Sequence, residues 1–195
     1  MEIKFNNKEI LLLQDTDFLL AKGVVLTKVK ELLQETRNHL RLKVESSSSV
    51  LPERLDVING KISRGENYKN LPYLVLDYPA LFKADDIFSY RTMFWWGNFF
   101  SATLHLQYRS LDYFRDSLIK NIDKFVKNKI YISVGQTPWE YHYGGTNYEL
   151  ITIEHLEHLK NCSFIKLSKK LKLNEWERLP VFSSKLLEFF LRNLQ

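Results

Sequence analysis

The sequence predicts an α+β domain in which an antiparallel meander sheet of about four to six strands packs with a long N-terminal helix and three further helices. Segments of strand length cluster in the middle of the chain, and segments with helical periodicity lie before and after them. The connections between the strands are short, which requires antiparallel neighbours because a parallel crossover needs about a dozen residues or more. A length of 195 residues with 45% hydrophobic residues fits one domain over residues 1–195.

The first element expected is a long amphipathic helix that begins after Asp15 or Thr16, either of which can cap its first turn. Apolar residues recur at helical spacing over residues 18–40, and Gly23 is the weak point of this pattern. The pattern ends in the serine-rich run 45–49. We expect a surface loop there, because serine side chains compete for backbone hydrogen bonds.

Four segments of strand length follow this loop, and turn residues such as Pro72, Pro79 and the pair Gly97-Asn98 separate them. The four segments comprise residues 61–68, 73–78, 87–96 and 99–107. We expect them to form the meander, with each segment paired to the next one along the chain.

The second half of the chain is expected to add three helices. Apolar periodicity predicts a helix over residues 110–125, and a final helix follows Pro180. Between them, Thr146 and Glu149 form a capping-box pattern, which predicts a helix that runs to about Asn161.

Two further strands are predicted between these helices. Residues 131–134 form a short strand-like run, and residues 164–173 alternate between apolar and polar side chains. Lys166, Ser168 and Lys170 share the polar face of the second segment. This alternation is typical of a solvated edge strand, in which lysines oppose pairing with another molecule.

The hairpin at Gly97-Asn98 sorts the side chains between the two faces of the predicted sheet. A two-residue turn there pairs Trp96 with Phe99, and the mostly apolar face, expected to face the helices, then contains Arg91 as its exception. A buried guanidinium needs a partner. Arg91 therefore either reaches water or pairs with a structural carboxylate such as Asp77, or it binds an anion at a pocket wall.

The other face of the predicted sheet mixes rings and hydroxyl groups, with Tyr90 expected opposite His105. Such a surface is either covered by another element or a second subunit, or it forms a ligand site. The nearby loop 138–145 holds Trp139, His142 and a flexible glycine pair. This loop either anchors its rings on the core or takes part in binding.

A weaker pattern lies in the predicted third helix, where His155, His158 and Cys162 are spaced by three and four residues and share one stripe. Imidazole and thiolate are zinc ligands, but the glutamate of the familiar helical zinc motif is missing. Histidine near a helix C-terminus is also favourable without a metal. We therefore predict no metal site and keep these three residues as a weak candidate.

Composition narrows the classes of partner and compartment. A net charge of +5 favours acidic partners only mildly, and the lysines lie on elements other than the rings, which argues against single-stranded nucleic acid. The apolar runs are shorter than the roughly 20 residues of a membrane span. Cys162 is the only cysteine and the first residues do not resemble a secretory signal, so we expect a cytoplasmic protein.

These observations favour a protein that binds a small anionic or aromatic ligand between the sheet and the 138–145 loop. The candidate ligand contacts are Arg91, Tyr90, His105, Trp139 and His142. The alternative is a module for protein–protein interaction or self-association, for example a homodimer, that uses the aromatic sheet face and has no enzymatic activity. The sequence indicates neither a catalytic mechanism nor a cofactor, because the familiar phosphate-loop, dinucleotide and nucleophile-elbow motifs do not occur in it.

Overall fold

The computed structural model describes residues 3–46 and 51–195. Within these residues, seven strands form one antiparallel sheet in the order β1-β2-β3-β4-β7-β5-β6, which confirms the α+β class with one strand more than the largest number expected. The strands are β1 (Lys61–Tyr68), β2 (Leu71–Lys83), β3 (Asp86–Trp95), β4 (Phe99–Tyr108), β5 (Tyr131–Ser133), β6 (Tyr148–Leu150) and β7 (Phe164–Leu171).

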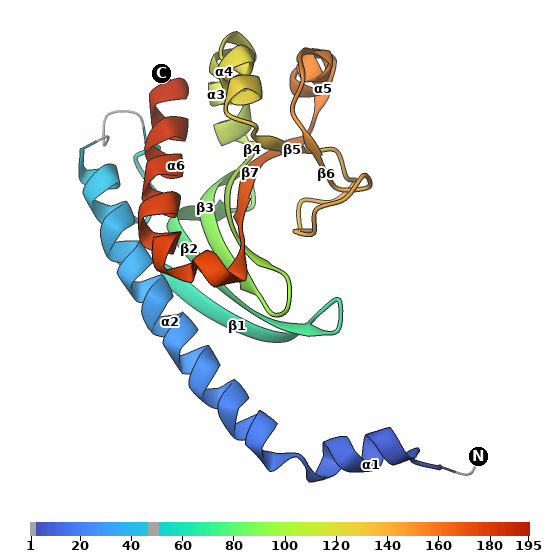
Figure 1. The fold of residues 1–195 in the computed structure, drawn as a ribbon. Coiled ribbons are helices and arrows are strands. Elements are labelled where there is room, and N and C mark those ends of the chain that lie inside the picture. The colour runs from blue at the N-terminus through green and yellow to red at the C-terminus, as the bar shows by residue number, and fades with distance from the viewer. Residues whose placement is uncertain (1–2, 47–50) are drawn as a thin grey trace.

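Helices cover one face of the sheet (Figure 1). The two long ones, α2 (Thr16–Glu45) and α6 (Leu179–Asn193), pack against each other and against the sheet, while α3 (Arg109–Lys120) packs on β3 and β4. The other helical segments are α1 (Asn7–Gln14), α4 (Ile122–Lys127), the 3-10 helices η2 (Ile153–His155) and η3 (Leu173–Arg178), and α5 (Leu156–Asn161). No helix in the described ranges has the length and apolar character needed to cross a membrane.

The long helix α2 is amphipathic, as predicted, but only from Leu26 onward. Its buried residues, Leu26, Val29, Leu33, Thr36, Leu40 and Val44, follow one another at spacings of three and four. Leu33 and Leu40 are completely buried in the main core. Before Leu26 the helix has no buried residue. Most of the serine-rich run predicted as a loop lies in residues 47–50, outside the described residues.

The β3–β4 hairpin reverses as predicted, but its loop is one residue longer. Trp95, not Trp96, pairs with Phe99. The backbone N–H of Asn98 donates to the Trp95 carbonyl at 3.1 Å, and Gly97 has a φ of +71°, as the third residue of a type II turn requires. Since side chains along a strand alternate with a period of two, this single residue turns β4 over relative to the predicted register.

The corrected register changes the contents of both sheet faces. Tyr90 pairs with Leu104, and both side chains face the helices in the main core. Arg91 and His105 lie together on the opposite face, since Arg91 pairs with Thr103 and His105 with Ser89. The predictions that Arg91 faces the helices and that Tyr90 lies opposite His105 were therefore wrong.

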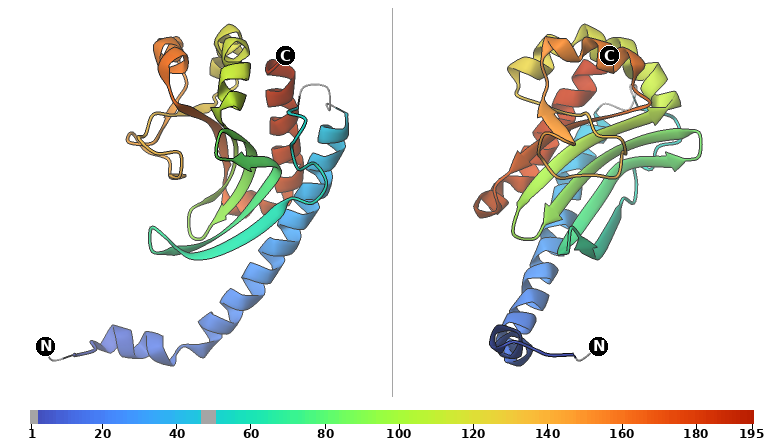
Figure 2. Two further views of the ribbon diagram at one scale, coloured as in Figure 1. Left: turned by 180° about the vertical axis from the view of Figure 1, so that it is seen from behind. Right: turned by 90° about the vertical axis from the view of Figure 1, so that its right-hand side faces the viewer.

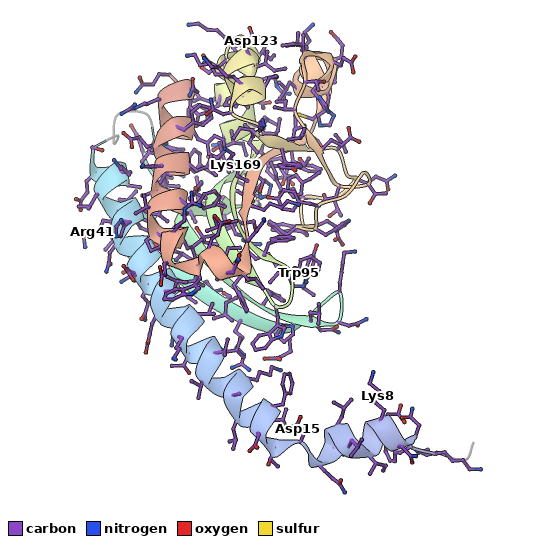
Figure 3. The ribbon with its side chains drawn as sticks, viewed as in Figure 1. Lys8, Asp15, Arg41, Trp95, Asp123 and Lys169 are labelled. Atoms are coloured by element: carbon purple, nitrogen blue, oxygen red, sulfur yellow. The ribbon has the colours of Figure 1, made fainter. Side chains whose placement is uncertain are left out.

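The loop between β5 and β6, residues 134–147, covers part of the face opposite the helices (Figure 2). Its Tyr141 packs with Val75, Met93 and Trp95 in a small second core. The Trp95 side chain lies on the side of the sheet away from α2 (Figure 3). Both faces of the central strands are therefore covered, one by helices and one by this loop.

Two other segments differ from the prediction. The helix expected from Thr146 to Asn161 is replaced by β6, η2 and α5, because Tyr148 is buried and pairs with Ser133 of β5. This tertiary contact outweighs the local capping pattern. The predicted edge strand is β7, which lies inside the sheet between β4 and β5. On its polar face Lys166 and Ser168 are buried, and Lys170 is exposed.

Candidate functional site

Polar side chains occupy the middle of the sheet on the face that the 134–147 loop covers. They lie in two neighbouring rows that cross strands β2, β3, β4 and β7. We call these seven residues the polar cluster: Asp77, Ser89, Arg91, Thr103, His105, Lys166 and Ser168. All of them are buried except Arg91, which is partly buried. Charged groups in the middle of a covered sheet need partners.

Arg91 forms a bidentate ion pair with Asp77, the carboxylate expected from the sequence. Its Nε and Nη2 donate to the two Asp77 carboxylate oxygens, both at 2.7 Å, and Ser89 donates to the first of them at 3.3 Å. The ring of Tyr141 lies 4.8 Å from the guanidinium carbon. Burial lowers the pKa of Arg91, but the Asp77 hydrogen bonds outweigh it and the pKa is raised overall. Arg91 is thus a charged group whose charge Asp77 compensates.

Lys166 is the second cation of the polar cluster, and it is completely buried. Its ammonium group donates to the backbone carbonyl of Glu140 and lies over the rings of Tyr141 and Tyr148, at 4.7 and 4.9 Å from their centroids. Among the described residues, no carboxylate forms an ion pair with it. Burial first, and then the charge of Arg91, lower its pKa from 10.5 to about 7.

His105 lies beside Lys166, because the two residues are directly paired between β4 and β7. Its ring contacts Trp139 edge to face at 5.7 Å, and its buried Nε2 has no hydrogen-bond partner among the described residues. Burial, and then the charges of Lys166 and Arg91, lower the pKa of His105 to about 3. The imidazole is therefore neutral at physiological pH and retains one free nitrogen.

Hydroxyl groups complete the polar cluster. Thr103 and Ser168 share a hydrogen bond of 2.7 Å, and the Tyr143 hydroxyl from the loop lies 2.5 Å from the Ser168 oxygen. Tyr143 stacks on Tyr148 at 4.9 Å. Because the three tyrosine rings of the loop region surround the cations and hydroxyls, the site combines charge, hydrogen-bonding groups and π surfaces.

Tyr68 at the end of β1 holds the loop in place. Its hydroxyl donates to the Glu140 carboxylate at 2.9 Å and accepts the backbone N–H groups of Tyr141 and His142, at 2.6 and 3.0 Å. His142 Nδ1 lies 2.9 Å from the same Glu140 oxygen. Burial raises the pKa of Tyr68 to about 12, so this hydroxyl keeps its proton. We call these contacts the Tyr68 latch.

The five predicted site residues do not all lie together. Arg91 and His105 belong to the polar cluster, Trp139 contacts His105 from the loop, and His142 is part of the Tyr68 latch. Tyr90 lies elsewhere, since its hydroxyl donates to the Ser183 carbonyl at 2.7 Å under α6.

Sequence reasoning missed Lys166, Thr103, Ser168 and the loop tyrosines as members of the site. The lysine was interpreted as solvated because its strand alternates. The three tyrosines at positions 141, 143 and 148 could have indicated that this loop packs on the sheet, since several rings close together in sequence are expected to be buried against another surface.

The weak metal candidates are not brought together. His155 Nδ1 lies 3.1 Å from the Thr152 hydroxyl, His158 Nε2 lies 2.9 Å from the Ser133 carbonyl, and Cys162 is next to Arg115. Within residues 3–46 and 51–195, no group of three His, Cys, Asp or Glu side chains could hold a metal ion. The positions of these residues are explained by the protein contacts alone.

Comparison with models of protein families, with curated proteins and with solved structures found no match to this chain. The function is therefore inferred from the geometry of the polar cluster and of the loop that covers it.

Proposed function

We propose that this chain binds a small anionic ligand, a carboxylate or a phosphate, between the sheet and the 134–147 loop. Lys166 carries the proposal. It is a completely buried ammonium group whose partners are a carbonyl and two rings, and no carboxylate pairs with it among the described residues. A buried cation without a matching anion is costly, whereas an anionic ligand would supply the missing charge.

Neighbouring groups favour the same class of ligand. Arg91 adds a second positive charge, which Asp77 compensates, so the polar cluster with Lys166 protonated has one net positive charge. The free Nε2 of His105 offers a hydrogen-bond partner beside Lys166. Tyr141 and Trp139 offer ring surfaces for the apolar part of the ligand, which suits an aromatic carboxylate.

Entry of the ligand requires the loop to move. In the closed arrangement the Glu140 carbonyl accepts a hydrogen bond from Lys166, and the Tyr68 latch holds the neighbouring backbone. An anion that reaches Lys166 takes the place of this carbonyl, and the loop then lies over the ligand. The loop therefore acts as a lid. We place this binding in the cytoplasm, the compartment that the single cysteine favours.

Titration calorimetry with benzoate and with inorganic phosphate tests this proposal. We expect at least one of the two probes to bind, and the substitution Lys166→Met to weaken its binding by about tenfold or more, the loss of one charge-assisted contact. Lys170→Met is the matched control, because Lys170 is exposed, on the same strand and on the same sheet face. The proposal fails if neither probe binds the wild-type chain, or if both variants bind as the wild type does.

A further inference from the structure

A second feature lies outside the polar cluster. Residues 3–25, which comprise α1 and the first part of α2, extend away from the sheet and the other helices, and at their base Lys22 pairs with Glu66 of β1 at 2.7 Å (Figures 1 and 2). We call this segment the arm. Lys8 and Asp15 mark its course in Figure 3. The helix α1 has no buried residue, and α2 has none before Leu26.

The arm exposes large apolar side chains along its whole length. Between Ile3 and Val25 there are eleven of them, and Leu11, Leu13 and Leu20 are 67%, 65% and 70% exposed. At about half exposure, side chains of this size present on the order of 100 Å² each, so the arm presents on the order of 1,000 Å² of apolar surface. This is more than the few hundred Å² of a usual exposed patch and matches the roughly 800 Å² that one partner contributes to a stable interface.

An apolar groove lies on the body where the arm leaves it. Val25, Val29 and Leu32 of α2 form one wall of a hollow of about 460 Å³, which Lys28 also borders. Trp96, Leu173 and Trp176 are among the residues that line its other side. Trp176 is 51% exposed. Because Val25 belongs to both features, the arm and the groove form one continuous apolar surface.

The arm has no net charge and carries apolar side chains on several sides, as a segment packed against another protein chain does. It carries three lysines, at positions 4, 8 and 22, and three acidic residues, at positions 9, 15 and 17, so it has no net charge to attract nucleic acid or an anionic membrane. Consecutive apolar runs at residues 10–13 and 18–20 place apolar side chains on several sides of the helices. A helix lying on a membrane instead keeps one strongly polar face.

We propose that the arm packs against a second copy of this chain in a two-fold symmetric dimer, in which each arm also reaches the groove of its partner. One chain carries both the apolar arm and an apolar groove, so two copies can bury both features at once, as an isologous interface requires. The apolar area of the arm meets the requirement for a stable dimer without a further protein. This inference is independent of the proposed ligand.

Sedimentation equilibrium of the full chain over about 1 to 100 µM tests the dimer. We expect a dimer, and we expect Leu12→Glu, Leu19→Glu and Trp176→Glu each to weaken it by roughly a hundredfold, because each residue occurs twice in a two-fold interface. Tyr113→Glu on α3 is the control, since Tyr113 is 79% exposed and lies outside the arm and the groove. We expect circular dichroism to report unchanged folding, because all four residues are exposed.

Two outcomes overturn the proposal. The wild-type chain remains a monomer at the highest concentration, or it forms a dimer that the arm and groove substitutions do not weaken. If the monomer sediments with vesicles of phosphatidylcholine and phosphatidylglycerol, the first outcome would also assign the arm to a membrane surface.

Discussion

The buried ammonium group of Lys166 makes the stability of the protein depend on pH in a defined way. In the folded chain, burial lowers the pKa of Lys166 to about 7, while its ordinary value is 10.5. Between these two pH values the unfolded chain holds the proton and the folded chain has lost it. The unfolded state then binds more protons, so the free energy of unfolding rises with pH through this window.

The size of this rise follows from the two pKa values. Linkage between protonation and folding gives an increase of about 2 kcal/mol in the free energy of unfolding between pH 7 and pH 9. The full penalty for the buried charge acts below pH 7 and is relieved above it. Replacing Lys166 by Met removes the titrating group and keeps most of the aliphatic side chain beside Tyr141 and Tyr148. We therefore expect Lys166→Met to abolish this part of the pH dependence.

Urea unfolding at pH 7, 8 and 9 measures the effect. The quantity compared is the change in the free energy of unfolding from pH 7 to pH 9, in the wild type, in Lys166→Met and in Lys170→Met. Other titrating groups contribute equally to all three chains, and the exposed Lys170 serves as the control. Equal profiles for the wild type and Lys166→Met would refute the argument that a buried ammonium group loses its proton near neutral pH.

Three further predictions concern the sheet and its hairpin. Arg91→Met leaves the buried Asp77 carboxylate unpaired and should lower the free energy of unfolding, measured in urea, by about 3 to 5 kcal/mol. A second substitution, Asp77→Leu, should restore most of this loss. A cost below about 1 kcal/mol for Arg91→Met would show that the ion pair is not structural. Because burial lowers the pKa of His105 to about 3, its ring nitrogens should show no protonation step by NMR from pH 5 to pH 8, beyond the small shift that titration of the neighbouring Lys166 causes. Stability should rise with pH from about 3 to 6.5, and a protonation step of the ring near pH 6.5 would contradict this. Gly97→Ala should lower the free energy of unfolding by about 1 kcal/mol, because Gly97 has a φ of +71°, and an unchanged urea midpoint would argue against this turn.

Much of the fold could be predicted because local patterns and the final contacts agree. The spacing of Leu33, Leu40 and their neighbours in α2 is the spacing of one buried helical face, and Gly97-Asn98 lies between β3 and β4 as predicted. Pro72 and Pro79 were wrongly predicted as turn residues, since both lie inside β2. The pairing of Arg91 with Asp77 could also be expected, because a buried guanidinium in a sheet needs a carboxylate nearby. These features depend on residues that are close in sequence or on adjacent strands.

The rest depends on contacts that local patterns do not encode. Lys166 alternates with apolar neighbours as a solvated lysine would, and only the loop about 25 residues earlier in the chain covers it. Tyr148 follows a capping pattern, but its burial against β5 produces a strand. The hairpin was predicted one residue too short, and this single error moved Arg91 and His105 to opposite faces of the predicted sheet.

The reversal between β3 and β4 has a consequence for the changes that its loop can accept. It joins the β1-β2-β3 part of the sheet to the β4-β7-β5-β6 part, and the pair Trp95–Phe99 closes it across residues 96–98. Deleting one of these three residues leaves a two-residue loop, which can join the same pair and keep every side chain on its own face. A slip of the pairing by one residue would instead aim Lys166 at the helices and bring Leu104 to the side of Arg91. The core and the polar cluster therefore depend on which residues pair across the hairpin, and the loop between them can change in length.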